Sequence, residues 1–348
     1  MYSAKPTLLT LYMLVIVLFA QTAQSKELML LNWPDYMDPD IVAEFKKRTG
    51  ITVKQYYFDS DTARNALLLE TGAKGFDIAL INDASINLLA QHGWLEPLDQ
   101  ASIPNLKHVD PRRHSELVQT KYFGVPYFWG TVGIAYRKDL VPFSVSSWMD
   151  LLQPNEVLHG KISMIGDSRD LISVALKALG YSINSTDDEE LKQAEALLYA
   201  QTPAVQTYRY LSLRADSTLL TGEVAMSMMY NGDALVLKKH DKNIVFIVPK
   251  EGSNIWVDYL SVLSSSPRKA QAKQFINFLN EPKVAAQLAQ YVHYASPNQA
   301  AEKLLPKEFR DNSIIYPNPE ALENSETHQR LNSNAQKKRT AIFSRIVY

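Results

Sequence analysis

Short apolar runs alternate with amphipathic segments along most of this chain, and this alternation restricts the possible fold more than any other feature. In the first part, runs with the composition of buried strands lie at 28–31, 51–57 and 76–81. Helix signals lie between them: Asp38 can cap a helix that starts at Pro39 and stops at Gly50. Strands that alternate with helices of about a dozen residues predict an α/β fold with parallel neighbours in the sheet.

The same pattern returns in the second part of the chain. Strand-like runs lie at 123–136, 162–164, 224–229 and 243–248, and amphipathic helices at 168–180 and 267–279. No linker rich in Gly, Ser or Pro separates the two parts. We therefore expect two packed lobes, each a mixed sheet flanked by helices, with the chain crossing between them more than once. The expected boundaries are 26–134 plus 258–304 for lobe 1 and 135–257 plus 305–348 for lobe 2. The polar segment 324–338 predicts a solvated helix or tail.

The first 25 residues differ from the rest. Their only charge is Lys5, an apolar run of 13 residues spans 8–20, and Ala23-Gln24-Ser25 is a small-x-small cleavage signal. The alternative is a membrane anchor, but a membrane-spanning helix needs about 20 apolar residues. The pattern favours a secretory signal peptide at 1–25 and a mature chain that is soluble in a bacterial periplasm.

The composition excludes several kinds of site and partner. The chain has no Cys, which removes disulfides, thiolate metal sites and a cysteine nucleophile. Its 36 basic and 37 acidic residues give a net charge of −1, which offers no general attraction to nucleic acid. Dinucleotide, phosphate-loop and serine-hydrolase motifs are absent, and none of the seven His has metal-ligand spacing. We expect neither enzyme activity nor a cofactor or metal.

Aromatic and acidic residues stand together where predicted strands end. The candidate site residues of this kind are Trp33, Asp35, Tyr36, Asn82, Asp83, Asp167, Asp170, Tyr230, Trp256 and Asp258. In α/β sheets the carboxyl ends of strands open onto the ligand crevice. Aromatic rings attract ammonium groups and cover methylenes, while buried carboxylates replace the water that each ammonium loses. The pattern indicates a site for an organic cation, although Asp167 and Asp170 alone are typical of a helix cap and first turn.

The order of these segments resembles that of the periplasmic spermidine/putrescine-binding proteins. The resemblance runs from about Leu28 to beyond Tyr316 and depends on nine motifs in one order. These are NWPDY at 32–36, FDI at 76–78, VPYFWG at 125–130, SWMDL at 147–151, LKALGYS at 176–182, YNG at 230–232, VPKEG at 248–252, WVD at 256–258 and YASPN at 294–298. The resemblance implies a two-lobed periplasmic binding protein of type II that holds a polyamine in the interlobe cleft and closes by a hinge.

The resemblance also implies roles for individual residues. Trp33, Tyr36 and Tyr294 match the family's aromatic walls, Asp35 and the pair Asp167 and Asp170 match its acidic positions, and Trp256 with Asp258 matches the clamp on the methylene chain and an inner amine. This chain departs from the spermidine-binding members at several positions: Pro34 for Thr, Asn82 for Ser, Ala84 for Tyr and Tyr230 for Trp. The neighbouring Asp83 adds a carboxylate there, and the family's last polar residue falls at His328 or Gln329.

The function implied by the resemblance is binding of a triamine such as norspermidine or spermidine. The membrane partner is either a signalling protein or an ABC permease. We favour the branch of the family that senses norspermidine and regulates cyclic-di-GMP signalling and biofilm formation. From the residues alone, two other readings stay open: a periplasmic binder of ferric ion, through Tyr56-Tyr57, or of a neutral sugar, and a secreted hydrolase that uses Asp167 and Asp170. We expect the mature protein to be a monomer.

Overall fold

The structure is a computed structural model that describes residues 27–111 and 122–348. The predicted signal peptide at 1–25 therefore lies outside the described residues. Within the described ranges, no helix is long and apolar enough to cross a membrane.

In the part of the chain that the structure describes, nine strands form one sheet in the order β2-β1-β3-β9-β4-β7-β5-β6, and β8 pairs with β4 outside this path. Neighbours are parallel within β2-β1-β3 and within β7-β5-β6, whereas β9 and β4 run antiparallel to their neighbours. The sheet is therefore mixed. The strands are β1 (Glu27–Asn32), β2 (Thr52–Tyr57), β3 (Ile78–Asn82), β4 (Val125–Arg137), β5 (Ile162–Ser163), β6 (Val205–Thr207), β7 (Met226–Tyr230), β8 (Ile244–Ile247) and β9 (Ile255–Val262).

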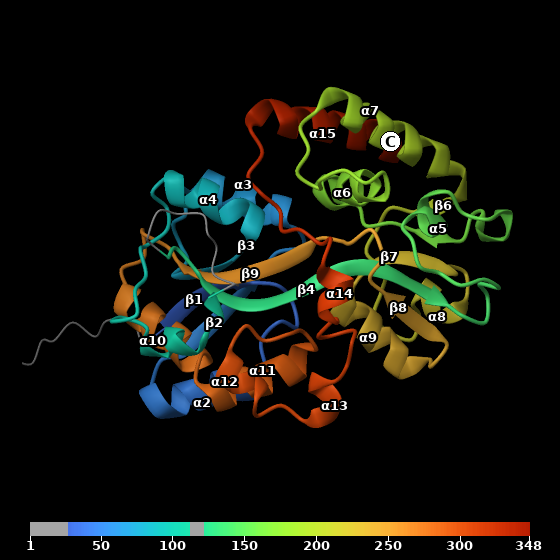
Figure 1. The fold of residues 1–348 in the computed structure, drawn as a ribbon. Coiled ribbons are helices and arrows are strands. Elements are labelled where there is room, and N and C mark those ends of the chain that lie inside the picture. The colour runs from blue at the N-terminus through green and yellow to red at the C-terminus, as the bar shows by residue number, and fades with distance from the viewer. Residues whose placement is uncertain (1–26, 112–121) are drawn as a thin grey trace, which may run out of the picture.

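Helices cover both faces of each half of the sheet (Figure 1). In the half that contains β1–β3, α3 and α4 lie on one face and α2, α10, α11 and α12 on the other, while in the second half α6, α7 and α15 lie opposite α8 and α9. The α-helices are α2 (Pro39–Thr49), α3 (Asp61–Thr71), α4 (Asp83–Gln91), α5 (Met149–Leu152), α6 (Ser168–Ala178), α7 (Asp188–Gln201), α8 (Thr218–Thr221), α9 (Asn231–His240), α10 (Lys269–Leu279), α11 (Pro282–Val292), α12 (Gln299–Glu302), α13 (Lys307–Arg310), α14 (Pro319–Leu322) and α15 (Ser333–Val347). Short 3₁₀ helices are η1 (Pro104–His108), η3 (Glu156–Leu158) and η4 (Thr202–Ala204).

The long strand β4 joins the two halves. Its residues up to Thr131 pair with β9, and from Val132 onward they pair with β7. The expected crossing strand is therefore present, and the chain passes from one half to the other without leaving the sheet. The exact lobe boundaries given above stay a prediction.

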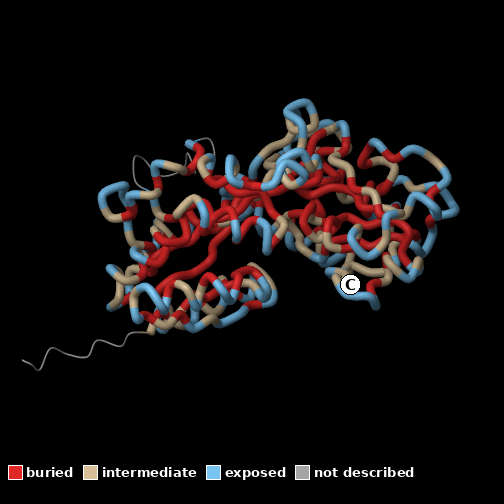
Figure 2. Tube along the Cα trace, turned by 90° about the horizontal axis from the view of Figure 1, so that it is seen from below, coloured by how far each residue is buried: buried red, intermediate tan, exposed pale blue. Residues whose placement is uncertain are grey.

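Two groups of buried apolar residues lie along this sheet (Figure 2). The larger one centres on β1, β3 and β9, with Phe45 from α2 and Phe275 from α10 packed at 4.8 Å between ring centroids. The smaller one contains the fully buried Trp148, whose indole Nε1 donates a 2.8 Å hydrogen bond to the carbonyl of Gly252. The larger group also includes Leu219, Leu235 and Phe246 from the second half, so it continues past the junction of the halves.

Local signals place the helix ends as the sequence predicts. The Asp38 side chain accepts a hydrogen bond from the backbone N–H of Asp40, and α2 stops at Gly50, which has a φ of 74°. That left-handed conformation costs Gly little because it has no Cβ.

The expectation for 324–338 is wrong in its first part. Residues 324–329 run along the junction of the halves, where the Glu326 carboxylate accepts a 2.6 Å hydrogen bond from Lys177 Nζ and where His328 is buried. Only from Ser333 onward does the segment form a helix, α15, which packs on α6 and α7. The expectation fails at the buried His328 and at the half-buried Ser325 and Glu326, whereas Asn324, Thr327 and Gln329 are exposed as predicted.

Candidate functional site

The candidate site lies where the two halves of the sheet meet. Asn82 ends β3 and Asp83 begins α4, while Tyr230 ends β7, so two strand ends from different halves contribute to it. On β9, Asp258 is the register partner of Asn82, and Trp256 is the partner of Gly130 on β4. A Cβ on Gly130 would lie 2.5 Å from the Trp256 ring, so only Gly lets the indole approach the strand this closely. The sheet register therefore gathers residues that are far apart in sequence.

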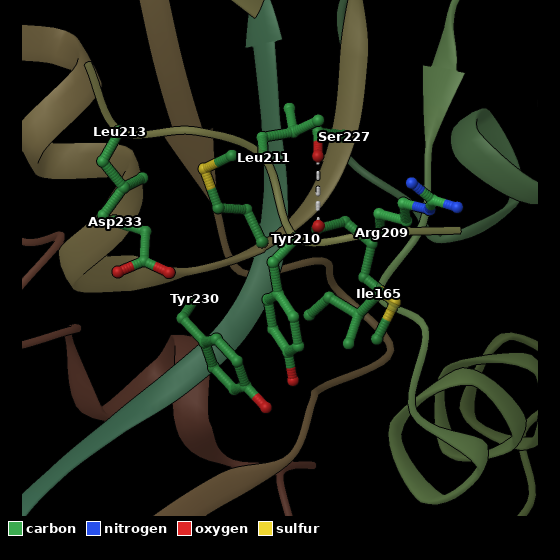
Figure 3. A pocket seen from close by; sticks show the side chains of 10 residues that line it. Ile165, Arg209, Tyr210, Leu211, Leu213, Ser227, Tyr230 and Asp233 are labelled. Atoms are coloured by element: carbon green, nitrogen blue, oxygen red, sulfur yellow. Dashed lines mark hydrogen bonds between the residues drawn. The ribbon is translucent and has the colours of Figure 1, made fainter. Parts of the chain in front are cut away.

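Aromatic rings form a continuous row through this region. Tyr36 and Tyr294 meet edge to face at 5.9 Å between ring centroids, and Tyr294 meets Trp256 in the same way at 4.8 Å. Trp256 then contacts Tyr230 at 6.0 Å, and Tyr230 stacks on Tyr210 at 6.2 Å. Figure 3 shows the last two rings side by side, at a small pocket that Asp233 also lines. The row presents faces and edges of electron-rich rings, which attract cations and cover methylene groups.

Asp258 lies against this row. The hydroxyl of Tyr36 donates a 3.1 Å hydrogen bond to Asp258 Oδ2. Burial raises the pKa of Asp258 to about 7, because the charged carboxylate is poorly solvated there. A cation next to Asp258 would supply the missing stabilisation of the charge.

Asp83 is the second carboxylate of this kind. The side chain is 5 % exposed, its Oδ1 accepts a 2.7 Å hydrogen bond from the backbone N–H of Ala84, and its Oδ2 has no hydrogen-bond partner. Burial raises its pKa to about 7. The adjacent Asn82 has a different role, since its Oδ1 caps α4 by accepting from the N–H of Ser85 and its Nδ2 donates to Asp61.

The pair Asp167 and Asp170 begins α6. Asp167 Oδ1 caps the helix by accepting hydrogen bonds from the backbone N–H groups of Arg169 and Asp170. Asp170 accepts a 2.6 Å hydrogen bond from the Tyr230 hydroxyl, and its Oδ1 lies 3.3 Å from His328 Nε2. Burial would raise the pKa of Asp170, but the hydrogen bond to His328 and the charge of Arg169 outweigh it, and the pKa falls to about 2. Asp167 therefore acts as a helix cap, which is one of the roles that the sequence pattern allows. Asp170 instead contacts the row of rings through its hydrogen bond with Tyr230.

The two remaining predicted residues lie at the edge. Trp33 packs on Phe58 with 4.4 Å between ring centroids and is half-buried. Asp35 is exposed and has a φ of 55°. The structure therefore brings Tyr36, Asn82, Asp83, Asp167, Asp170, Tyr230, Trp256, Asp258 and Tyr294 into one network, with Trp33 at its border and Asp35 on the surface.

Four further residues belong to the network although the sequence pattern did not single them out as site residues. Tyr210 extends the row of rings, and Asp233 accepts a 2.9 Å hydrogen bond from the Tyr294 hydroxyl. Arg169 bonds across to Asp61 at 3.1 Å. Asp233 follows the YNG motif directly, and Arg169 lies between Asp167 and Asp170. Their closeness in sequence to predicted site residues could therefore have identified them.

His328 and Gln329 lie in different surroundings. His328 is 3 % exposed and reaches Asp170, whereas Gln329 is exposed and its backbone N–H donates to Asn184. Burial lowers the pKa of His328, so the imidazole is held neutral beside Asp170.

The two tyrosines on which the ferric-ion hypothesis depends lie outside this network. Tyr56 and Tyr57 are both exposed on β2, and Tyr56 packs against Phe76. Among the described residues, no group of three or more His, Cys, Asp or Glu side chains is arranged to hold a metal ion. The chemistry that the network offers is that of rings and carboxylates, which suits an organic cation.

Comparison with known proteins gives a consistent picture. The family model described as bacterial extracellular solute-binding protein matches residues 40–317. A norspermidine sensor from Vibrio cholerae serotype O1 is 32% identical over 340 residues, which cover 97% of this chain and 93% of that protein. A spermidine/putrescine-binding periplasmic protein from Escherichia coli K12 is 31% identical over 309 residues, 88% of each chain.

A solved structure shows the same likeness in three dimensions. The putative spermidine/putrescine ABC transporter from Listeria monocytogenes superimposes with a TM-score of 0.84 at 32% sequence identity. The alignment covers 92% of this chain and 99% of that one. The likeness therefore extends over both halves of the molecule.

Proposed function

This chain belongs to the bacterial extracellular solute-binding protein family, and we propose that it binds a linear polyamine, with a triamine such as norspermidine or spermidine as the preferred ligand. Family membership confirms the predicted two-lobed binding-protein fold of type II, and the periplasmic relatives confirm the predicted location. The relatives are solute-binding proteins rather than enzymes.

One observation carries the proposal: Asp258, partly buried, lies against the row of aromatic rings, and Asp83, buried at the acidic end of the site, also lacks a salt-bridge partner within residues 27–111 and 122–348. Among the described residues, neither Asp258 nor Asp83 has a salt-bridge partner, and both have a pKa raised to about 7 by burial. An ammonium group placed beside each would restore its charge, because opposite charges attract strongly in a poorly solvated site. The rings of Tyr36, Trp256 and Tyr294 would cover the methylenes between the ammonium groups.

The other predicted residues extend this site. Asp167 and Asp170 form the acidic end of the site at α6, and Tyr230 links Asp170 to the rings. Asn82 and Trp33 lie on the other side of the site, in the half that contains β1–β3. Asp233 adds a carboxylate whose pKa burial raises to about 6. Carboxylates at several positions along one row of rings match a ligand whose charges are separated by methylene spacers.

The binding experiment is a thermal-shift and calorimetric screen of the mature chain, residues 26–348. Putrescine, cadaverine, norspermidine, spermidine and spermine are compared with ferric citrate and neutral sugars. A ligand that binds only the folded state stabilises it by about 2.7 kcal/mol at 100 times its Kd. Stabilisation by triamines alone supports the proposal, and stabilisation by ferric citrate or a sugar, with no response to any amine, contradicts it.

We further propose that the closed, liganded form signals to a membrane protein that regulates cyclic-di-GMP and biofilm formation. Alignment of a norspermidine sensor with 97% of this chain supports that role. The alternative is the substrate-binding subunit of a spermidine/putrescine importer, which the similarity to the spermidine/putrescine ABC transporter protein from Listeria monocytogenes supports. Cells with and without the gene distinguish the two roles. Loss of a norspermidine-dependent cyclic-di-GMP response with unchanged uptake of labelled spermidine supports the sensor, and the reverse result supports the importer.

A further inference from the structure

The guanidinium of Arg169 lies among four carboxylates at the acidic end of the site, and a second guanidinium, that of Arg64, pairs with one of them, Asp61. Arg169 Nη2 is 3.1 Å from Asp61 Oδ2, and its Nε is 3.9 Å from Asp170 Oδ1, beyond hydrogen-bond distance. Asp83 and Asp167 are close enough that their charges also favour the charged form of Arg169. The four carboxylates come from three helices, so this is a meeting point of elements rather than the charged face of one helix.

The ion pair between Arg169 and Asp61 joins the two halves of the molecule. Asp61 is the first residue of α3, which covers the half with β1–β3, and Arg169 lies in the first turn of α6 in the other half (Figure 1). Asp61 is held in place from its own side, because Arg64 Nη1 donates to its Oδ1 at 2.6 Å and Asn82 donates to its Oδ2. Arg169 therefore reaches across to an acceptor that is already oriented.

Hydrogen bonding at this end is incomplete. Arg169 Nε and Asp83 Oδ2 are both buried without a hydrogen-bond partner. In a purely structural ion-pair network, buried donors and acceptors are normally all hydrogen-bonded to one another. Here one donor and one carboxylate oxygen of the same charged cluster have no partner among the described residues. The cluster thus keeps a free anionic position beside a fixed internal cation.

We infer that Arg169 determines specificity by occupying one cation position of the acidic end with its own guanidinium, and so limits the number of ammonium groups that a ligand can place there. This inference rests on the proposed binding of polyamines. One ammonium fits beside Asp83, whereas a further ammonium near Asp61 or Asp170 meets the positive charge of Arg169. Diamines and triamines are admitted, and a tetraamine such as spermine is disfavoured by this repulsion.

The test is the ratio of the Kd of spermine to the Kd of norspermidine, measured by calorimetry for the wild type and four variants. Arg169→Gln removes the internal cation, and we expect the ratio to fall at least tenfold in favour of spermine. Arg169→Lys keeps a positive charge at the position and should leave the ratio within about threefold of the wild-type value. Arg48→Gln, at an exposed arginine paired with Glu44 and Glu281 on the outer surface, controls for the change in net charge.

Asp61→Asn separates charge from lobe closure. This variant breaks the ion pair between Arg169 and residue 61 but leaves the guanidinium of Arg169 at the acidic end of the site. It should therefore lower the affinity for every amine by a similar factor. An unchanged ratio in Arg169→Gln, with the wild type still binding triamines, would overturn the inference and leave the proposed function intact. Absence of triamine binding in the wild type would overturn both.

Discussion

The phenol of Tyr36 and the carboxylate of Asp258 share a hydrogen bond of 3.1 Å across 222 positions of sequence. Tyr36 follows β1, and Asp258 lies on β9, so the bond ties two segments of the same half together at the site. The backbone of Tyr36 has a second phenol as partner, because the hydroxyl of Tyr127 donates a 3.0 Å hydrogen bond to the carbonyl of Tyr36. Two phenols of similar burial thus have separate roles, one toward the carboxylate and one toward the backbone.

These roles predict different outcomes for the two Tyr→Phe variants. Tyr36→Phe removes the donor to Asp258, and since hydrogen bonds to charged groups are worth about 1.5–3 kcal/mol, triamine affinity should fall about tenfold or more. Tyr127→Phe serves as the matched control, because it loses a backbone contact and should lower Tm without changing affinity in the folded protein. Calorimetry on both variants checks this, and equal losses of affinity would argue against the assigned role of Tyr36.

Asp258→Asn should have opposite effects on binding and on stability. Removing one partner of a buried charged contact typically costs about 2–5 kcal/mol of binding, so triamine affinity should become very weak. The unliganded variant should gain stability at pH 8. Because burial raises the pKa of Asp258 from 3.8 to about 7, the wild type loses stability as pH rises through this range, and Asn does not. Thermal melts at pH 5 and pH 8 measure this difference, and an Asn variant that tracks the wild type at both pH values would contradict it.

Ligand affinity should rise with pH between 6 and 8. Asp258 and Asp83 each have a pKa raised to about 7 and must be ionised to bind an ammonium group, whereas the terminal amines of the ligand, with a pKa of about 10 for an aliphatic amine, stay charged throughout. Each carboxyl therefore contributes about a tenfold increase in affinity over these two pH units. Calorimetry in buffers of different ionisation enthalpy would also detect the released protons. A flat pH profile would mean that neither carboxyl changes ionisation on binding.

His328 and Gln329 offer a matched pair of neighbouring substitutions. His328→Leu leaves Asp170 without one of its hydrogen-bond partners and should weaken triamine binding by about 1–3 kcal/mol, the usual cost of an unsatisfied buried polar group. Gln329→Leu changes an exposed side chain and should leave affinity unchanged. His328→Gln tests whether another polar side chain restores the contact. If His328→Leu bound as tightly as the wild type, the C-terminal segment would have no part in the site.

The sequence predicts those parts of the structure that depend on local chemistry. Asp38, Pro39 and Gly50 mark the ends of α2 through interactions with residues a few positions away. Trp256 and Asp258 are recognisable because they stand together on one short strand. Contacts such as Arg169 with Asp61 depend instead on how two halves of the sheet are oriented, and no local pattern contains that orientation.

Two residues illustrate this limit from opposite directions. Asp35 stands between two aromatic residues in the sequence, yet its backbone has a φ of 55° and its side chain is exposed. His328 lies in a polar segment that predicts solvent exposure, yet it is buried at the junction. In both cases the turn or the path of the chain decides where the side chain lies, and residue type alone does not predict its exposure.

The uninterrupted strand β4 has a consequence for how the protein loses its structure. Since residues before and after Thr131 belong to one strand, melting either half removes the ladder partners from one end of β4 and leaves the N–H and C=O groups of that end unpaired. Neither half is therefore an independent unit in the way that domains joined by a flexible linker are. Heat or denaturant should unfold both halves in a single cooperative transition, and the larger apolar group, which includes residues of both halves, favours the same result.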